Sequence, residues 1–334
     1  MLLCRGFLQT RFPLASGRRS VKITPIDKLI IGNGAGPIKD LAGVEKACKS
    51  GVSTRVTVGA GTVPPVQGNT PAKAEGTFYI HPIELWAMNS LGLPNPGEDE
   101  WRKRLPKMVE IAHGSGKSLG FNASGFAPSE YGKLVRLSAE CNVDYVQVNL
   151  SCSNVWGPAG NKAIAAENPD LVVDILEKVE RAIPFQSAIE VEVKVAPNDN
   201  PKLVDHLCDV IAYAGIVKRV VVANAKGGRR RTRPDGSDAL AFTVGDDPKI
   251  IHIGALSGSA LTEHTPKLVQ MYYDRLSPSI GVVALGGIFN GQHAWECIKR
   301  GAVGFECTTA YFQYGEGIFN DIVEGLPSEY ALAA

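Results

Sequence analysis

Short apolar segments alternate with amphipathic segments along this chain of 334 residues, and this alternation constrains the fold most strongly. The expected strands are 29–31, 55–58, 118–122, 145–149, 189–194, 219–222, 282–285 and 303–306. The expected helices include 101–113, 129–141, 168–182, 201–214, 265–276 and 292–300. Strands that alternate with helices pair in parallel through right-handed crossovers. The pattern therefore predicts an α/β protein, a TIM (β/α)8 barrel with long strand-end loops.

An open, doubly wound sheet is the alternative for such a pattern, and it usually begins with a G-x-G-x-x-G turn. The segments 32–36 and 59–61 are rich in glycine, but neither completes that motif. Glycine makes up 36 of the 334 residues, which exceeds the usual content of roughly 7%. We therefore expect several sites where the backbone turns sharply or approaches a ligand.

Residues 1–19 predict an N-terminal extension, and residues 20–334 predict one barrel domain. The extension contains arginine and serine but no acidic residue, which is typical of a mitochondrial presequence. A loosely packed tail is the alternative. We expect a cytoplasmic protein, or a mitochondrial one if the extension directs import.

Charge and cysteine content exclude several classes of function. The net charge of +1 argues against a nucleic-acid partner, and no apolar run is long enough to predict a membrane span. The seven cysteines are scattered without a CxxC pair, which predicts free thiols and no metal site.

Polar and small residues follow the predicted strands, where TIM barrels carry their active sites. Gly286-Gly287 and Thr308-Thr309 follow the last two strands and suit a phosphate group, although a plain turn is the alternative. Lys194 ends the fifth strand, where a buried ammonium needs an anion or a ring oxygen. A salt bridge from Lys194 to a nearby glutamate is the alternative interpretation.

Cys152 is the best candidate for a reactive group, because it follows the fourth strand in a loop of Asn and Ser residues. An inert thiol is the alternative. Asn89, Asn149, Asn154 and Asn224 also lie in strand-end loops. Asparagine offers a donor and an acceptor without charge, which suits a planar ligand such as a pyrimidine. Each Asn could equally be an ordinary turn residue.

Together these segments resemble the class 1 dihydroorotate dehydrogenases, and the resemblance covers nearly the whole chain from residue 20. The motifs are SVKITPIDKLIIGNGAG at 20–36 (the family's N-terminal hairpin into strand one), NSLGLPN at 89–95, NLSCSN at 149–154, 194–197, 223–224, GALSG at 254–258, 285–288 and 301–310. The pair NSLGLPN and NLSCSN is specific for this family, which is related to the pyrimidine-reducing domain of dihydropyrimidine dehydrogenase.

The resemblance implies one FMN at the strand ends and assigns residues to it and to the substrate. Cys152 matches the active-site base. The residues implied for FMN are Ala35, Gly36, Gly59, Ala60, Asn122, Asn149, Lys194, Ala223, Gly258, Gly286, Gly287, Thr308 and Thr309. The residues implied for the substrate are Asn89, Leu91, Gly92, Leu93, Asn149, Asn154, Asn224 and Ala225.

The implied reaction oxidises dihydroorotate to orotate in de novo pyrimidine (UMP) biosynthesis. Cys152 removes the C5 proton while the C6 hydride passes to FMN. Fumarate is the implied electron acceptor, and a homodimer is the implied assembly.

Two departures from the family concern one side of the pyrimidine pocket. Gly59-Ala60 stands where the family has a Lys-Ser pair, and Ala225 stands where it has Ser or Thr. A basic residue of the 229–233 loop is one candidate replacement for the missing lysine. Two alternatives follow: an FMN ene-reductase of the dihydropyrimidine type, whose substrate lacks the carboxylate, or a non-catalytic barrel that binds FMN or phosphate.

Overall fold

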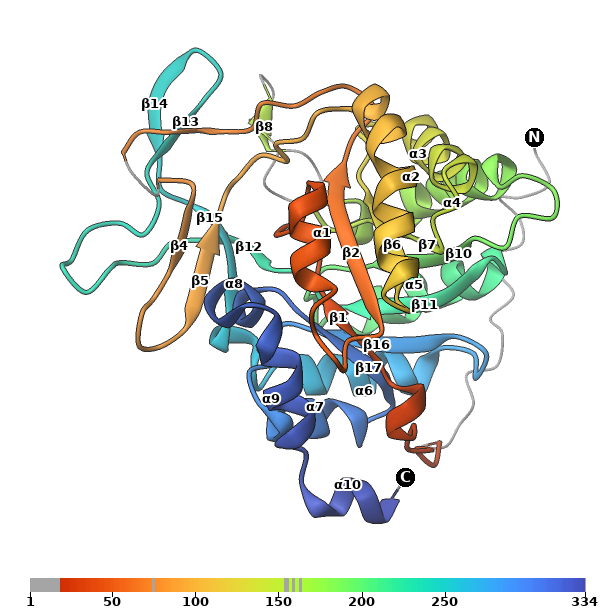
Figure 1. Cartoon of the computed structure of the whole chain (residues 1–334). Coiled ribbons are helices and arrows are strands. Elements are labelled where there is room, and N and C mark those ends of the chain that lie inside the picture. Colours follow the sequence, from red (N-terminus) through yellow and green to blue (C-terminus); the bar gives the residue numbers. More distant parts are fainter. Residues whose placement is uncertain (1–18, 74–75, 153–155, 158–159, 162–163, 334) are drawn as a thin grey trace.

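The chain forms a closed barrel of eight parallel strands surrounded by helices, in the order β1-β17-β16-β11-β10-β7-β6-β2 (Figure 1). The computed structural model describes residues 19–73, 76–152, 156–157, 160–161 and 164–333. The barrel strands are β1 (Ile30–Asn33), β2 (Arg55–Gly61), β6 (Ser118–Ala123), β7 (Tyr145–Asn149), β10 (Glu190–Lys194), β11 (Val217–Val222), β16 (Gly281–Leu285) and β17 (Ala302–Cys307). Each expected strand is present, so the predicted TIM barrel is confirmed.

The helices lie outside the barrel and include all six that the sequence predicts (Figure 1). They are α1 (Leu41–Ala47), α2 (Glu98–Gly114), α3 (Pro128–Glu140), α4 (Pro169–Ala182), α5 (Pro201–Ala214), α6 (Thr265–Arg275), α7 (Gly291–Ile298), α8 (Thr309–Tyr314), α9 (Ile318–Glu324) and α10 (Ser328–Ala333). Short 3-10 turns are η2 (Ile26–Lys28), η3 (Ala165–Glu167), η4 (Ser259–Leu261) and η5 (Gly315–Gly317). The residues at the N-terminus explain where α4 and α5 begin. Asn168 and Asn200 each cap a helix whose first residue is proline.

Side chains alternate along each barrel strand between the helix layer and the barrel interior. In β10, Val191 and Val193 join the main apolar core, whereas Glu192 and Lys194 are buried among polar residues of the interior. The interior of this barrel is therefore charged, and its buried charges must be paired with each other or with a ligand.

The long strand-end loops contain strands that the sequence analysis did not predict. They are β3 (Thr70–Pro71), β4 (Phe78–Ile80), β5 (Trp86–Asn89), β8 (Trp156–Gly157), β9 (Gly160–Asn161), β12 (Lys226–Arg229), β13 (Phe242–Val244), β14 (Asp247–Ile251) and β15 (Gly254–Gly258). The sheet β12-β15-β5-β4, called the added sheet below, lies beside the barrel at the left of Figure 1. A separate apolar core at this sheet contains Trp86, Met88 and Phe242. This core fixes β5 and β15, which carry Asn89 and Gly258 toward the barrel mouth.

The N-terminal segment differs from the hairpin that the resemblance implies. Between residues 19 and 29 the described chain contains the turn η2 and no strand. Arg19 donates a hydrogen bond from Nη1 to the Leu276 carbonyl (2.8 Å) and lies over the Tyr273 ring. The predicted extension otherwise falls on residues 1–18, which lie outside the described residues.

Candidate active site

A pocket opens at the carboxyl ends of the barrel strands and encloses about 1180 Å³ of empty space, its open mouth included. Nearly all residues that the sequence singles out line it. They are Ala35, Gly36, Ala60, Asn89, Leu91, Gly92, Leu93, Asn122, Asn149, Cys152, Lys194, Ala223, Asn224, Ala225, Gly258, Gly286, Gly287, Thr308 and Thr309. Gly59 is not among the lining residues, and Asn154 lies outside the described residues.

A chain of hydrogen bonds connects the amide side chains on one side of the pocket. Asn122 Nδ2 donates to Gln147 Oε1 (2.8 Å), and Asn149 Nδ2 donates to Asn122 Oδ1 (3.1 Å). Ser151 Oγ donates to Asn149 Oδ1 (3.1 Å) and accepts from Asn224 Nδ2 (2.9 Å). This chain fixes the amide planes, so the remaining Asn donors and acceptors face the pocket in a set orientation. Asn149 and Asn224 are therefore more than ordinary turn residues.

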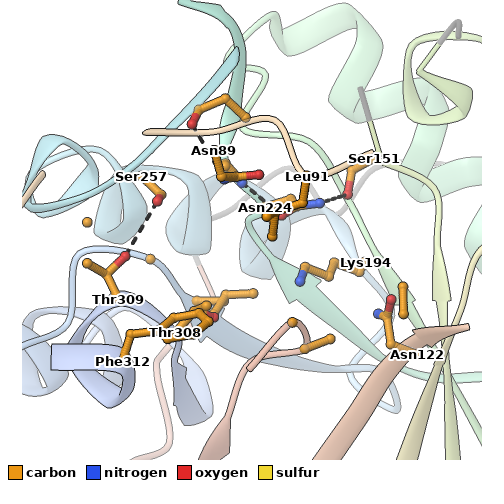
Figure 2. A pocket seen from close by; sticks show the side chains of 18 of the residues that line it. Asn89, Leu91, Asn122, Ser151, Lys194, Asn224, Ser257, Thr308, Thr309 and Phe312 are labelled. Carbon is orange, nitrogen blue, oxygen red and sulfur yellow. Dashed lines mark hydrogen bonds between the residues drawn. The ribbon is translucent and has the colours of Figure 1, made fainter. Parts of the chain in front are cut away.

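Lys194 is 3% exposed, and its side chain points into the pocket from the end of β10 (Figure 2). Burial lowers the pKa of this ammonium, and the charges of Glu306 and Cys152 act in the opposite direction. No salt bridge from Lys194 to a glutamate is seen in the described part of the chain, because Glu190 and Glu192 pair with arginines. The Lys194 ammonium and the Cys152 side chain therefore lie close enough for their charges to act on each other.

A buried ion cluster lies in the barrel beneath Lys194. The Arg55 guanidinium donates to Glu192 Oε1 and Glu306 Oε1, at 2.7 Å each, and Arg219 also pairs with Glu192. Burial raises the pKa of Glu306, offset only in part by Arg55. Burial acts the same way on Glu192, but its two arginines outweigh it and lower the pKa. Among the described carboxylates, that of Glu306 acts on the charge of Lys194.

The opposite side of the pocket is built from small residues and hydroxyl groups. Thr309 Oγ1 lies 3.4 Å from Ser257 Oγ, and Figure 2 shows Thr308, Thr309 and Phe312 across from Lys194. Gly287 has a φ of 72°, and a Cβ there would lie 2.3 Å from the backbone nitrogen of Thr262. Only glycine fits this position, where the Gly-Gly turn packs directly against the backbone at Thr262.

Substitution of Gly287 by alanine is expected to destabilise the protein by about 1–3 kcal/mol, because the added methyl group meets fixed backbone. The free energy of unfolding from a urea titration measures this loss. Gly317→Ala is the matched control, because Gly317 has a φ of −61° and a methyl group added there would have no neighbouring atom within 4 Å. A Gly287→Ala variant as stable as this control would contradict the close packing described here.

Several lining residues were not predicted from sequence. Phe78 and Phe312 contact each other at the pocket, with ring centroids 5.0 Å apart. Ser257 comes from β15, and Lys39 comes from the connection between β1 and α1. Phe78 and Ser257 lie on strands of the added sheet, so their place at the pocket depends on strand pairing that no local pattern indicates.

The basic loop does not supply the missing lysine. None of the residues 229–233 lines the pocket. Arg230 pairs with Asp238, Arg231 lies over the Trp86 ring, and Arg233 lies over the Tyr79 ring. The predicted replacement by this loop is therefore wrong, because its cations are engaged beside the added sheet.

Comparison with known proteins defines the class to which this barrel and pocket belong. The sequence model of the dihydroorotate dehydrogenase family matches residues 28–330, so the chain belongs to that family. Dihydroorotate dehydrogenase B (NAD(+)), catalytic subunit, of Methanocaldococcus jannaschii is 24% identical over 72% of both chains. The putative dihydroorotate dehydrogenase A (fumarate) of Aeropyrum pernix is 26% identical over 77% of this chain and 76% of that protein.

A solved structure supports the same fold. Ligand-free DHODH from Eimeria tenella aligns with a TM-score of 0.74 over 99% of this chain and 92% of that one, at 20% identity. None of the helices in the described part of the chain combines the length and the apolar character needed to cross a membrane.

Proposed function

We propose that this protein is an FMN-dependent dihydroorotate dehydrogenase of class 1. The observation that carries the proposal is the convergence of Cys152, Lys194 and the hydrogen-bonded asparagines in one pocket. A thiol beside an ammonium suits proton removal, and oriented amides suit a planar pyrimidine. Membership of the family supports the same activity.

The pocket fits a flavin mononucleotide in two respects. Gly286-Gly287 and Thr308-Thr309 follow the last two barrel strands, where TIM barrels bind phosphate. At the other end, Lys194 supplies a buried ammonium without a hydrogen-bond partner among the described residues, which suits an electron-rich ring atom. When bound, FMN supplies hydride acceptance, the redox part of the reaction.

The residues of this chain have separable tasks in the proposed reaction. Cys152, as thiolate, takes the C5 proton of dihydroorotate as general base. Lys194 keeps positive charge beside that thiolate. Asn149 and Asn224 hold the pyrimidine through the donors and acceptors that their hydrogen bonds to Ser151 and to the neighbouring backbone leave unused. Positioning of this kind accounts for a large part of enzymatic rate enhancement.

Fumarate is the electron acceptor that we propose for the second half of the reaction, in a cytoplasmic homodimer. The relatives named above carry different acceptors, NAD and fumarate, in their names.

Purified protein is expected to be yellow, to release FMN on denaturation, and to oxidise dihydroorotate with fumarate as acceptor. Absorbance of the released flavin and of the orotate formed measures both properties. Parallel assays with NAD and a quinone test the acceptor alone. Colourless protein that never takes up added FMN would overturn the proposal, whereas turnover only with NAD or a quinone would overturn the choice of fumarate.

A further inference from the structure

Lys39 reaches the pocket from a part of the chain that carries no motif. It lies in the connection between β1 and α1, directly before Asp40, which caps α1. Its Nζ donates a hydrogen bond to the Pro94 carbonyl (2.6 Å), and both residues line the pocket. Pro94 follows Leu91, Gly92 and Leu93, the lining segment assigned above to the substrate. The ammonium is thus held against the substrate side of the pocket.

The charges around the pocket leave Lys39 without a counterion. Lys39 and Lys194 are the charged side chains among its described lining residues, and no carboxylate is present in that lining. Lys194 has Glu306 nearby. Lys39 forms no ion pair with any described carboxylate, and burial lowers its pKa to about 8. An ammonium has three donors, and one carbonyl satisfies one of them. The remaining donors are therefore available to an anionic ligand.

A backbone contact at the end of β2 brings Lys39 to the substrate side of the pocket. The amide nitrogen of Gly59 donates to the Ile38 carbonyl (3.0 Å), so the connection before α1 lies against the end of β2. Gly59 has a φ of 109°, and a Cβ there would lie 2.9 Å from the Asn122 carbonyl oxygen. The next residue, Ala60, contributes only a methyl group to the lining. Since the end of β2 supplies no charge, the adjacent Lys39 is the available cation.

We propose that the Lys39 ammonium binds the carboxylate of the substrate and selects carboxylated over uncharged dihydropyrimidines. The inference rests on the proposed function, because it assumes that dihydroorotate occupies this pocket. It also makes a substrate without the carboxylate less favourable, because such a ligand leaves the ammonium partly desolvated and unpaired. A phosphate group could satisfy the same donors, but Gly286-Gly287 and Thr308-Thr309 provide a separate place for it.

The test uses the FMN-loaded protein and the variants K39M, K39R and K49M. Lys49 is an exposed residue between α1 and β2 and does not line the pocket, so K49M is the matched control. We expect K39M to weaken orotate binding, measured by titration of the flavin spectrum, by about 10- to 100-fold, the range for one hydrogen bond to a charged group. K39M should bind uracil at least as tightly as wild type, because it removes an ammonium that uracil leaves unpaired. K39R should restore most of the orotate affinity because it keeps the charge.

The outcomes distinguish this inference from the proposed function. Wild-type protein that binds orotate, together with a folded K39M that binds it equally well, would overturn only the role of Lys39. A K39M variant that loses FMN but binds orotate normally after reconstitution would assign Lys39 to the phosphate and also overturn the inference. Wild-type protein that is not reduced by dihydroorotate would overturn the proposed function itself. Thermal unfolding identifies a K39M variant that fails to fold. In that case the affinities of wild type and K39R for orotate and for uracil are compared. If both proteins bind uracil more tightly than orotate, the role of Lys39 is contradicted.

Discussion

Replacement of Cys152 by alanine is expected to slow flavin reduction by dihydroorotate by about 10²- to 10⁴-fold, the usual contribution of a general base. Cys152 lines the pocket together with Lys194 and the connected asparagines. Alanine removes the proposed base for the C5 proton and leaves those neighbours in place. FMN content and orotate affinity should therefore stay close to wild type. Rapid mixing under anaerobic conditions measures the rate of flavin bleaching.

Cys48→Ala is the control for this experiment. Cys48 is half-buried at the end of α1, does not line the pocket, and burial raises the pKa of its thiol. We expect this variant to bleach at the wild-type rate. A Cys152→Ala variant that bleaches as fast as the Cys48→Ala variant would remove the base assignment, even if the protein oxidises dihydroorotate.

Replacement of Arg55 by methionine is expected to lower the free energy of unfolding by about 3–5 kcal/mol, the range for breaking a buried ion pair on one side. Arg55 is 4% exposed and contacts Glu192 and Glu306, both 0% exposed. Its loss leaves Glu306 without its arginine. Glu192 keeps Arg219 as a partner, so the cost arises mainly at Glu306. A denaturant titration of the FMN-loaded protein measures the change.

Arg102→Met and a double variant provide the controls for the ion cluster. Arg102 is 48% exposed and pairs with Glu98 and Glu140 on the surface, so its loss should cost about 0–1 kcal/mol. Glu306→Gln combined with Arg55→Met should recover part of the stability, because it removes the unpaired carboxylate. If Arg55→Met costs no more than Arg102→Met, the buried cluster does not stabilise the barrel as described.

The barrel could be predicted from sequence because its strands are short and buried, with β-branched residues repeated along them. In β7 the predicted bounds, 145–149, are those observed. Asn149 and Lys194 end neighbouring strands in register, so their convergence follows from the fold alone. Strand-end position was a sufficient signal for most of the pocket.

The remaining features depend on contacts between distant segments. Asn89 reaches the pocket because β5 pairs with β15, which places Asn89 opposite Ala255. Lys39 depends on Pro94, which is 55 residues away in sequence, and on the backbone of Gly59. Such contacts have no local periodicity. The absence of the family's lysine at Gly59 was visible in the sequence. The position of Lys39 beside Gly59 was not, because it depends on the fold.

Anaerobic mixing of the FMN-loaded protein with a limiting amount of dihydroorotate tests the central claim most directly. The claim is that this pocket transfers hydride from dihydroorotate to a bound flavin. Loss of flavin absorbance and formation of orotate should occur together, with one orotate formed for each flavin reduced, while dihydrouracil leaves the flavin oxidised. A flavin that dihydroorotate does not bleach, or that dihydrouracil bleaches equally fast, would contradict the account.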